Sequence, residues 1–422
     1  MLKRITIATT FFMAIGWFLT SPASYHEVGE ARTIGDVPEA ITNADIGDII
    51  AKDLVSLGDG VPGHDDILHI PGSSKVLVSA RDEWIWKVDL ATKEAKRLVF
   101  SPVSPTGSRM DPGNDNLAYF CMARLDYNTY DQGPGLYQLD IEKASFTPVL
   151  TRVPLTGRLR EDGLELPNFD EVGKAKVYAQ PLLETPITSL NKSNSRPMQF
   201  CNDLDVSRDG KHIYMSEPFN HPKASSGLGA VPEAITLARN GRVWRYNTET
   251  KEVGLVVENS IFADGVLIEY DEQGNETGLL ITETVNFLIS RAHLTGPKAE
   301  SYDILWDNLP SMPDGMDRDE DGRVWVGLIK DRSPMVTWLH KNPWLKPLIL
   351  RAPASWLSSS GGTGFMVLSE DASEVLAYSH YSGEKVRDLL VVIPVEGKLF
   401  LSRFFKDNNG VHYVSLKSVL KE

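Results

Sequence analysis

Asparagine and aspartate residues stand directly before strand-like runs at four widely separated places in the chain. These segments are residues 63–67 (GHDDI), 201–205 (CNDLD), 262–266 (FADGV) and 313–317 (PDGMD). Asp and Asn side chains supply oxygen ligands, and calcium takes about six to eight of them. Oxygen-bearing signals at the start of four repeated β units therefore predict one central site for a hard metal ion.

The elements that must position these side chains follow a repeated phrase: a turn with glycine, a basic residue, then alternating aliphatic and aromatic residues. Clear copies start at residues 209, 240, 321 and 396, and looser copies start at 83 and 135. Such turns favour tight hairpins, and the alternation indicates strands with one buried face. Most gaps between copies have the size of a propeller blade. We predict an all-β, six-bladed β-propeller with a central metal site and loop or helix insertions on one face; eight blades or a sandwich are the alternatives.

Length and charge agree with this class of protein. A chain of 422 residues is long for one ordinary core, but repeated units pack mainly on their neighbours. The net charge of -14 argues against nucleic acid, and against an anionic membrane surface, as the main partner. It suits a protein that binds a cation.

The N-terminus reads as a targeting segment. Lys3 and Arg4 precede an apolar run over residues 5–19, and Ser21-Pro22-Ala23 resembles a cleavage site. We predict a signal peptide or N-terminal membrane anchor over 1–24, a lead-in segment over 25–58 and the propeller over 59–422. The body is then exported, either periplasmic or secreted, or membrane-anchored and facing outward. The two cysteines, Cys121 and Cys201, are either a disulfide or two buried thiols.

Three segments depart from the blade rhythm. Residues 151–197 and 219–239 are insertions that either carry function or only cover a blade edge. Residues 334–357 are rich in Trp, Leu and Pro. This third segment is a lid, an apolar surface for membrane association, or a part that packs on the neighbouring blade.

The order and spacing of several motifs resemble the strictosidine synthase-like branch of the six-bladed propellers, which is related to gluconolactonase (regucalcin) and to the paraoxonases. The resemblance is strongest between Asn202 and Leu328 and weaker from about residue 59 to the C-terminus. It rests on residues 202–203 (ND), 241–246 (GRVWRY), 264–266 (DGV), 294–299 (LTGPKA) and 307–314 (DNLPSMPD).

The resemblance implies a calcium ion in the central tunnel, held by one side chain from each of four blades. The matching positions are Asp65, Asn202, Asp264 and Asp314. Relatives usually have Glu at the first position and often Asn at the third, and both replacements here still offer oxygen. The paraoxonase-like branch has a second, structural calcium, for which Asp66 and Asp203 are the matching residues.

The resemblance also implies a reaction. Calcium in a water-poor tunnel can polarise an ester or lactone carbonyl. Asp314 matches an aspartate with a proposed double role as ligand and general base. The catalytic His of paraoxonases is absent, because the matching turn is Pro105-Thr106-Gly107, and Pro394 stands where strictosidine synthases have their Glu.

Three histidines are candidates to replace the missing group, namely His64, His221 and His380, and we favour His221 because it lies in an insertion. We therefore predict an exported calcium-dependent hydrolase of lactones or aryl esters, with Asp314 and His221 as catalytic residues. The alternative is a non-catalytic propeller that binds a small molecule or a protein and keeps calcium for stability.

Overall fold

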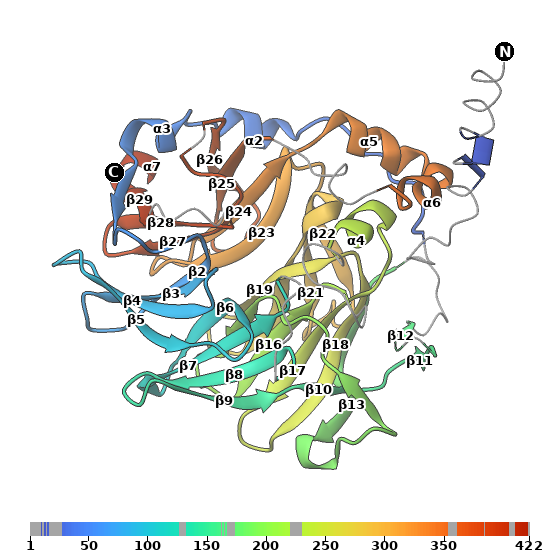
Figure 1. Cartoon of the computed structure of the whole chain (residues 1–422), viewed down its shortest axis with the longest axis horizontal. Coiled ribbons are helices and arrows are strands. Elements are labelled where there is room, and N and C mark those ends of the chain that lie inside the picture. The colour runs from blue at the N-terminus through green and yellow to red at the C-terminus, as the bar shows by residue number, and fades with distance from the viewer. Residues whose placement is uncertain are drawn as a thin grey trace.

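The computed structural model describes residues 28–125, 132–161, 163, 165–166, 174–219, 230–352, 361–383, 385–404 and 410–420, together with 10, 12–13 and 15–16. Its antiparallel sheets are arranged around a centre, as the blades of a propeller are (Figure 1). This confirms the predicted all-β propeller class. None of the helices in the described part of the chain is long and apolar enough to cross a membrane.

The sheets follow one another along the chain as meanders. The first two meanders contain β2 (His64–His69), β3 (Lys75–Ala80), β4 (Trp84–Asp89) and β5 (Ala95–Phe100), then β6 (Ser104–Asp111), β7 (Asn114–Ala123), β8 (Gly135–Asp140) and β9 (Ser145–Leu150). The third contains β15 (Leu204–Val206), β16 (His212–Glu217), β17 (Gly241–Asn247) and β18 (Glu252–Ser260).

The remaining meanders complete the ring. They contain β19 (Ala263–Tyr270), β20 (Glu276–Glu283), β21 (Leu288–His293) and β22 (Tyr302–Trp306), then β23 (Ser311–Arg318), β24 (Val324–Asp331), β25 (Thr363–Leu368) and β26 (Val375–Tyr381). The last contains β27 (Leu389–Val395), β28 (Lys398–Arg403) and β29 (Val411–Ser415), with β1 (Val55–Leu57) as its outer strand. The lead-in segment therefore supplies one strand of the ring.

The number of blades depends on how the first and last meanders are divided. They belong to one sheet, because β2 and β28 share the single residue pair His64↔Arg403. The sheets alone do not separate these two units, and six stays the predicted number.

The glycines of the repeated phrase form the expected turns. Gly210, Gly322 and Gly397 have φ of 73°, 84° and 74°, a left-handed conformation that glycine adopts without steric cost. These residues precede β16, β24 and β28. The hydrophobic residues after each turn are buried between neighbouring sheets; for example, Leu280 of β20 packs in one cluster with Met316 of β23.

The first insertion is partly a blade edge. Residues 151–197 contain β10 (Arg152–Pro154), β11 (Arg158–Leu159), β12 (Glu165–Leu166), β13 (Lys176–Pro186), the short helix η1 (Ile187–Ser189) and β14 (Ser195–Pro197). β13 pairs with β18 as a fifth strand of the third meander. The alternative of an edge cover therefore holds for β13. The rest of the insertion is held by buried Arg196, which contacts Glu165 at 2.6 Å and Glu217 at 2.8 Å.

The insertion at 219–239 and the third segment at 334–357 contribute short helices on one side of the molecule (Figure 1). They are α4 (Val231–Thr236), α5 (Pro334–Lys341), η4 (Pro343–Leu345) and α6 (Lys346–Ile349). Ile235, Leu339 and Leu350 join these insertions in a small buried cluster. Other helices in the described part of the chain are α2 (Glu39–Asn43), α3 (Ile49–Asp53), η3 (Thr284–Asn286) and α7 (Leu416–Leu420).

The two cysteines are paired. Cys121 of β7 and Cys201, which precedes β15, form a disulfide between the second and third meanders. The sequence left this question open because the two residues are 80 positions apart.

Candidate functional site

The four predicted ligands line one cavity. Asp65 lies at the start of β2, Asn202 just before β15, Asp264 at the start of β19 and Asp314 near the start of β23. All four contact the same cavity of about 340 Å³. Strands from four separate sheets thus bring together side chains that are up to 249 positions apart in sequence (314 − 65).

The rest of this cavity is mainly apolar. Its walls include Phe200, Phe219, Phe262 and Leu390, and its cover includes residues of α4 and α5. Asp65, Asn202, Asp264 and Asp314 form the polar floor of the cavity. A polar floor under apolar walls can hold a small molecule that has one reactive polar group and an apolar remainder.

Hydrogen bonds fix the floor in place. Asn202 Nδ2 donates to Asp264 Oδ1, and Thr284 Oγ1 donates to Asp264 Oδ2 at 2.7 Å. Thr282 Oγ1 donates to the carbonyl oxygen of Asp314 at 2.7 Å, which ties the start of β23 to the preceding sheet. The carboxylate positions are therefore set by the meeting of the inner strands.

The electrostatics of the floor favour a cation. Burial, with smaller contributions from Asp66 and Asp264, raises the pKa of Asp65 to about 7 against the opposing charge of Arg81. Burial, Asp264 and Asp65 together raise the pKa of Asp314 well above its usual value. The carboxylates repel one another in a place where water screens them poorly, and a bound cation relieves that repulsion.

Carboxylate and amide oxygens are suitable ligands for calcium, so the residue types fit the predicted ion. Within the described residues, however, no three His, Cys, Asp or Glu side chains are close enough together to hold a metal ion. The calcium site and its ligand set therefore stay a prediction.

The residues predicted for a second calcium have protein partners. Asp66 Oδ1 accepts from the backbone N–H of Ile67, and its Oδ2 accepts from the N–H of Ser108 at 2.7 Å. Asp203 accepts backbone bonds from Leu204 and Val266. The bonds to Ser108 and Val266 join neighbouring sheets, so both carboxylates have a structural role without a metal.

Arg109 of β6 supplies positive charge beside these two carboxylates. Its guanidinium lies 3.9 Å from Asp66, 3.6 Å from Asp205 and 3.9 Å from Asp317. Burial lowers the pKa of Arg109, but these acidic neighbours outweigh it and raise the pKa above its usual value. A second cation at Asp66 and Asp203 would face this guanidinium, which is unfavourable for binding.

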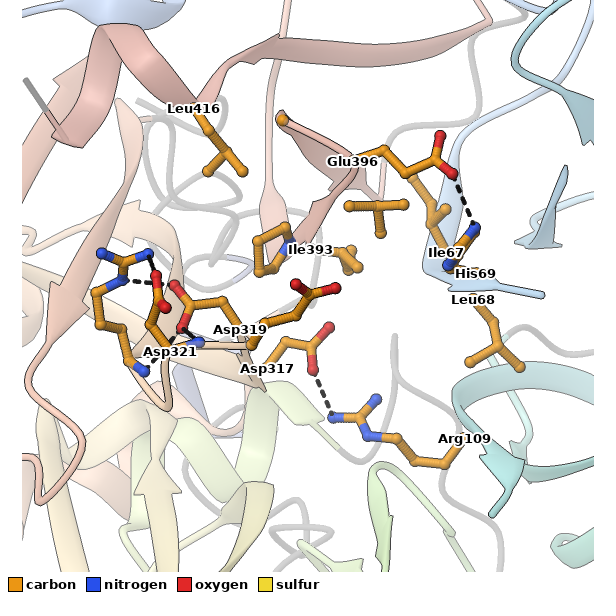
Figure 2. Close-up of a pocket in the computed structure, with 15 residues that line it drawn as sticks. Ile67, Leu68, His69, Arg109, Asp317, Asp319, Asp321, Ile393, Glu396 and Leu416 are labelled. Atoms are coloured by element: carbon orange, nitrogen blue, oxygen red, sulfur yellow. Dashed lines mark hydrogen bonds and ion pairs between the residues drawn. The ribbon is translucent and has the colours of Figure 1, made fainter. Parts of the chain in front are cut away.

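Beyond Arg109 the inner strands border a second, polar pocket of about 370 Å³. Figure 2 shows Arg109 and Asp317 pointing toward each other in this pocket, with Asp319, Asp321 and Glu396 nearby. Pro394, which stands in place of the strictosidine synthase Glu, lines this polar pocket.

Of the three histidine candidates from the sequence, the structure describes His64 and His380. His64 is fully buried, its Nδ1 lies 3.0 Å from the carbonyl oxygen of Pro62, and burial lowers its pKa to about 3. His380 Nε2 lies 3.0 Å from both carboxylate oxygens of Asp331. Neither is among the described residues that line the cavity. His221 lies outside the described residues.

Two residues explain the altered turn at 105–107. Thr106 Oγ1 donates to the carbonyl oxygen of Cys201 at 2.9 Å, which is a structural contact. Gly107 lies against Asp203, and a Cβ atom at this position would come within 2.9 Å of the Asp203 Cα. Only glycine allows this close approach between the second and third meanders.

His340 is not among the residues predicted from the sequence, but it lines the cavity. His340 ends α5, within the segment that we interpreted as a lid or an apolar surface. No motif marks it, because its role depends on where the helix packs.

The comparisons with known proteins agree with this architecture. The adipocyte plasma membrane-associated protein of Salmo salar is 35% identical over 160 residues, which are 37% of each chain. The strictosidine synthase-like 10 protein of Arabidopsis thaliana is 26% identical over 57% of this chain and 62% of its own. The chain thus spans little more than a third of the first relative and less than two thirds of the second. No family model matches the chain.

A gluconolactonase of Xanthomonas campestris has a similar structure, with a TM-score of 0.50 at 12% identity, over 93% of this chain and 96% of its own. At this identity the likeness concerns the fold. The homologues named strictosidine synthase-like and the gluconolactonase fold confirm the resemblance on which the sequence analysis relied.

Proposed function

We propose that the protein is a calcium-dependent hydrolase of a lactone or aryl ester, and that Asp65, Asn202, Asp264 and Asp314 hold the ion. The observation that carries this proposal is the group of mutually repelling carboxylates at the floor of a mainly apolar cavity, buried at Asp264 and half-buried at Asp65 and Asp314. When bound, calcium would polarise the carbonyl of the substrate. The gluconolactonase fold supports the same reaction class.

Residues of the chain itself bind the substrate, orient the carboxylates and accept a proton. The apolar walls bind the non-reacting part of the substrate and exclude bulk water, which strengthens electrostatic interactions on the floor. Asn202 orients Asp264 through its amide hydrogen bond. Asp314 offers a carboxylate that can take a proton from an attacking water. Within the described residues, its Oδ1 accepts one bond, from the Gly315 N–H at 3.1 Å.

A panel of lactones and aryl esters tests the proposal. Turnover and bound metal are measured on the same samples before chelation, after chelation and after calcium is added back. We expect activity to be lost and regained with calcium and to be absent in Asp314→Ala. Asp321→Ala, in a turn of the same sheet, is the matched control and should keep activity.

Bound calcium without turnover, together with chelation that only lowers the melting temperature, would support the alternative of a non-catalytic binding propeller. One observation favours that alternative: Thr106 and Pro394 stand where the related enzymes have catalytic His and Glu.

We also propose that the body lies outside the cytoplasm and that its helical side rests on a membrane. Met335 and Trp338 of α5 and Trp344 of η4 are 61%, 55% and 73% exposed. The lead-in reaches the same side, since Gly29 N–H donates to Thr236 of α4 and Arg32 N–H donates to the carbonyl oxygen of His340 of α5. A lipid surface would cover the exposed tryptophans on the side of the molecule that the lead-in reaches.

Co-sedimentation with phosphatidylcholine vesicles checks this membrane contact. We expect Trp338→Ser/Trp344→Ser to weaken binding of a chain shortened to residues 28–422, with the melting temperature unchanged. Equal binding by the double variant and its parent would refute the contact. Trp84→Ser, on the outer part of the first meander, is the control.

A further inference from the structure

His340 lies on the side of the cavity that α4 and α5 cover, and its environment is unusual for a polar side chain. Its side chain is fully buried, and it lines the cavity together with Val336 and Leu339 of the same helix. Within the described residues, neither Nδ1 nor Nε2 has a hydrogen-bond partner. A neutral imidazole carries one donor and one acceptor, so two hydrogen-bonding positions are left without a partner.

A buried imidazole without hydrogen-bond partners lowers the stability of the protein unless a ligand supplies those partners. A buried polar atom without a partner costs about 1–3 kcal/mol, and an apolar side chain of similar size would pack on the Leu339 cluster without that cost. The helix does not need the ring for its own hydrogen bonds, since the backbone carbonyl of His340 already accepts from Arg32. The ring is therefore better explained by a ligand than by packing.

The charges around the ring keep it neutral. Burial, with smaller contributions from Lys346 and Arg32, lowers the pKa of His340 to about 3. Lys346 Nζ donates to the carbonyl oxygen of Thr236, and Arg32 donates to Asn286, so both cations are held in place. Lys330 and Asp388 also line the cavity. A neutral ring binds uncharged groups that donate or accept hydrogen bonds, such as hydroxyl or amide groups.

We propose that His340 is a specificity-determining residue that binds a hydroxyl or amide group in the non-reacting part of the substrate. The ligand class is thus an ester or lactone whose apolar part carries a second uncharged polar group. The carbonyl lies at the carboxylate floor, and the second group lies against α5. This inference rests on the proposed function for the reacting end, but the binding contact does not require turnover.

Two probes with the same side chain test the contact. Both are γ-lactones with a six-carbon chain, and only one carries a hydroxyl group on that chain. Calorimetry with the calcium-loaded protein gives the dissociation constants, and initial rates give kcat and KM. We expect the hydroxylated lactone to bind about 10-fold more tightly to the native protein, the effect of one neutral hydrogen bond.

Three variants separate a ligand contact from a structural role. His340→Phe should abolish the preference between the probes through KM with little change in kcat, and should keep or raise the melting temperature. His340→Gln, which retains a donor and an acceptor, should keep part of the preference. Val336→Ala, on the same helix, should weaken both probes equally and leave the preference unchanged.

An unchanged preference in His340→Phe would overturn the proposal, and so would a native protein that binds both probes equally. Binding preference without hydrolysis would support the role of His340 while refuting the hydrolase, so the two failures can be told apart.

Discussion

At the scale of single residues, the site is defined by carboxylates that the fold places where water solvates them poorly. Asp65, Asp264 and Asp314 each have a pKa raised first by burial and then by neighbouring acidic groups. A raised carboxyl pKa means that the native state binds more protons than the unfolded state. The free energy of unfolding therefore falls as the pH rises through this window.

We expect the chelated protein to lose stability between about pH 4 and about pH 7, the range from the ordinary pKa of Asp65 to its raised value. Calcium should restore stability at about pH 8 and have little effect at about pH 5, because protons then compete for the same oxygens. Thermal melts across pH, with calcium or with chelator, measure this. Asp264→Asn should make the dependence shallower, and a flat profile in the chelated protein would contradict the interpretation.

A second prediction at this scale concerns Arg109. Its guanidinium faces Asp66, Asp205 and Asp317, and its removal would leave one buried and two half-buried carboxylates without their cation. We expect Arg109→Met to lower the free energy of unfolding by about 3–5 kcal/mol.

Urea unfolding measures this loss. Arg97→Met is the control, since the exposed Arg97–Asp82 pair should contribute about 0–1 kcal/mol. Similar losses in the two variants would show that Arg109 is not a central ion-pair residue.

At the scale of elements, contacts between neighbouring sheets hold the floor of the cavity. The disulfide joins Cys121 of β7 to Cys201, the residue next to Asn202. Gly107 and Asp203 approach closely at the same junction. The position of Asn202 therefore depends on how the second and third meanders meet.

The disulfide closes a loop of 80 residues, and such a long crosslink stabilises by about 4 kcal/mol in the chain-entropy model. We expect Cys121→Ala/Cys201→Ala to lose about that amount and to bind calcium more weakly. Urea unfolding and calcium titration measure both effects. Reduction of the native protein should reproduce the loss of stability, and equal stability of oxidised and reduced protein would exclude this role.

At the scale of the whole molecule, the ring closes through the lead-in segment. β1 pairs with β29 from Val55↔Tyr413 to Leu57↔Val411. Ile49 and Ile50 of α3 are buried in a cluster with strands of the last two meanders. The start and the end of the chain therefore stabilise the same part of the fold.

We expect removal of residues 1–27 to leave the melting temperature unchanged and removal of residues 1–57 to lower it strongly. Each buried aliphatic side chain that is lost contributes about 1.5–3 kcal/mol. Differential scanning calorimetry measures both chains. Ile50→Ala provides a milder version and should cost about 2–5 kcal/mol; an unchanged melting temperature in this variant would contradict a closing role for the lead-in.

Local patterns were sufficient for the propeller class and for the positions of the strands that follow Gly210, Gly322 and Gly397. They also placed an oxygen-bearing signal at the start of four repeats, and the family resemblance selected Asp65, Asn202, Asp264 and Asp314, which line one cavity. Turn preference and alternation act over a few residues, so they can be read from the chain itself.

Only the tertiary structure decided the pairing of Cys121 with Cys201, the use of residues 176–186 as a fifth strand, the ion pairs of Arg109 and the place of His340 in the cavity. Each depends on contacts between segments that are far apart in sequence. Such contacts arise from the packing of complete sheets and helices, and no local pattern of residue types encodes them.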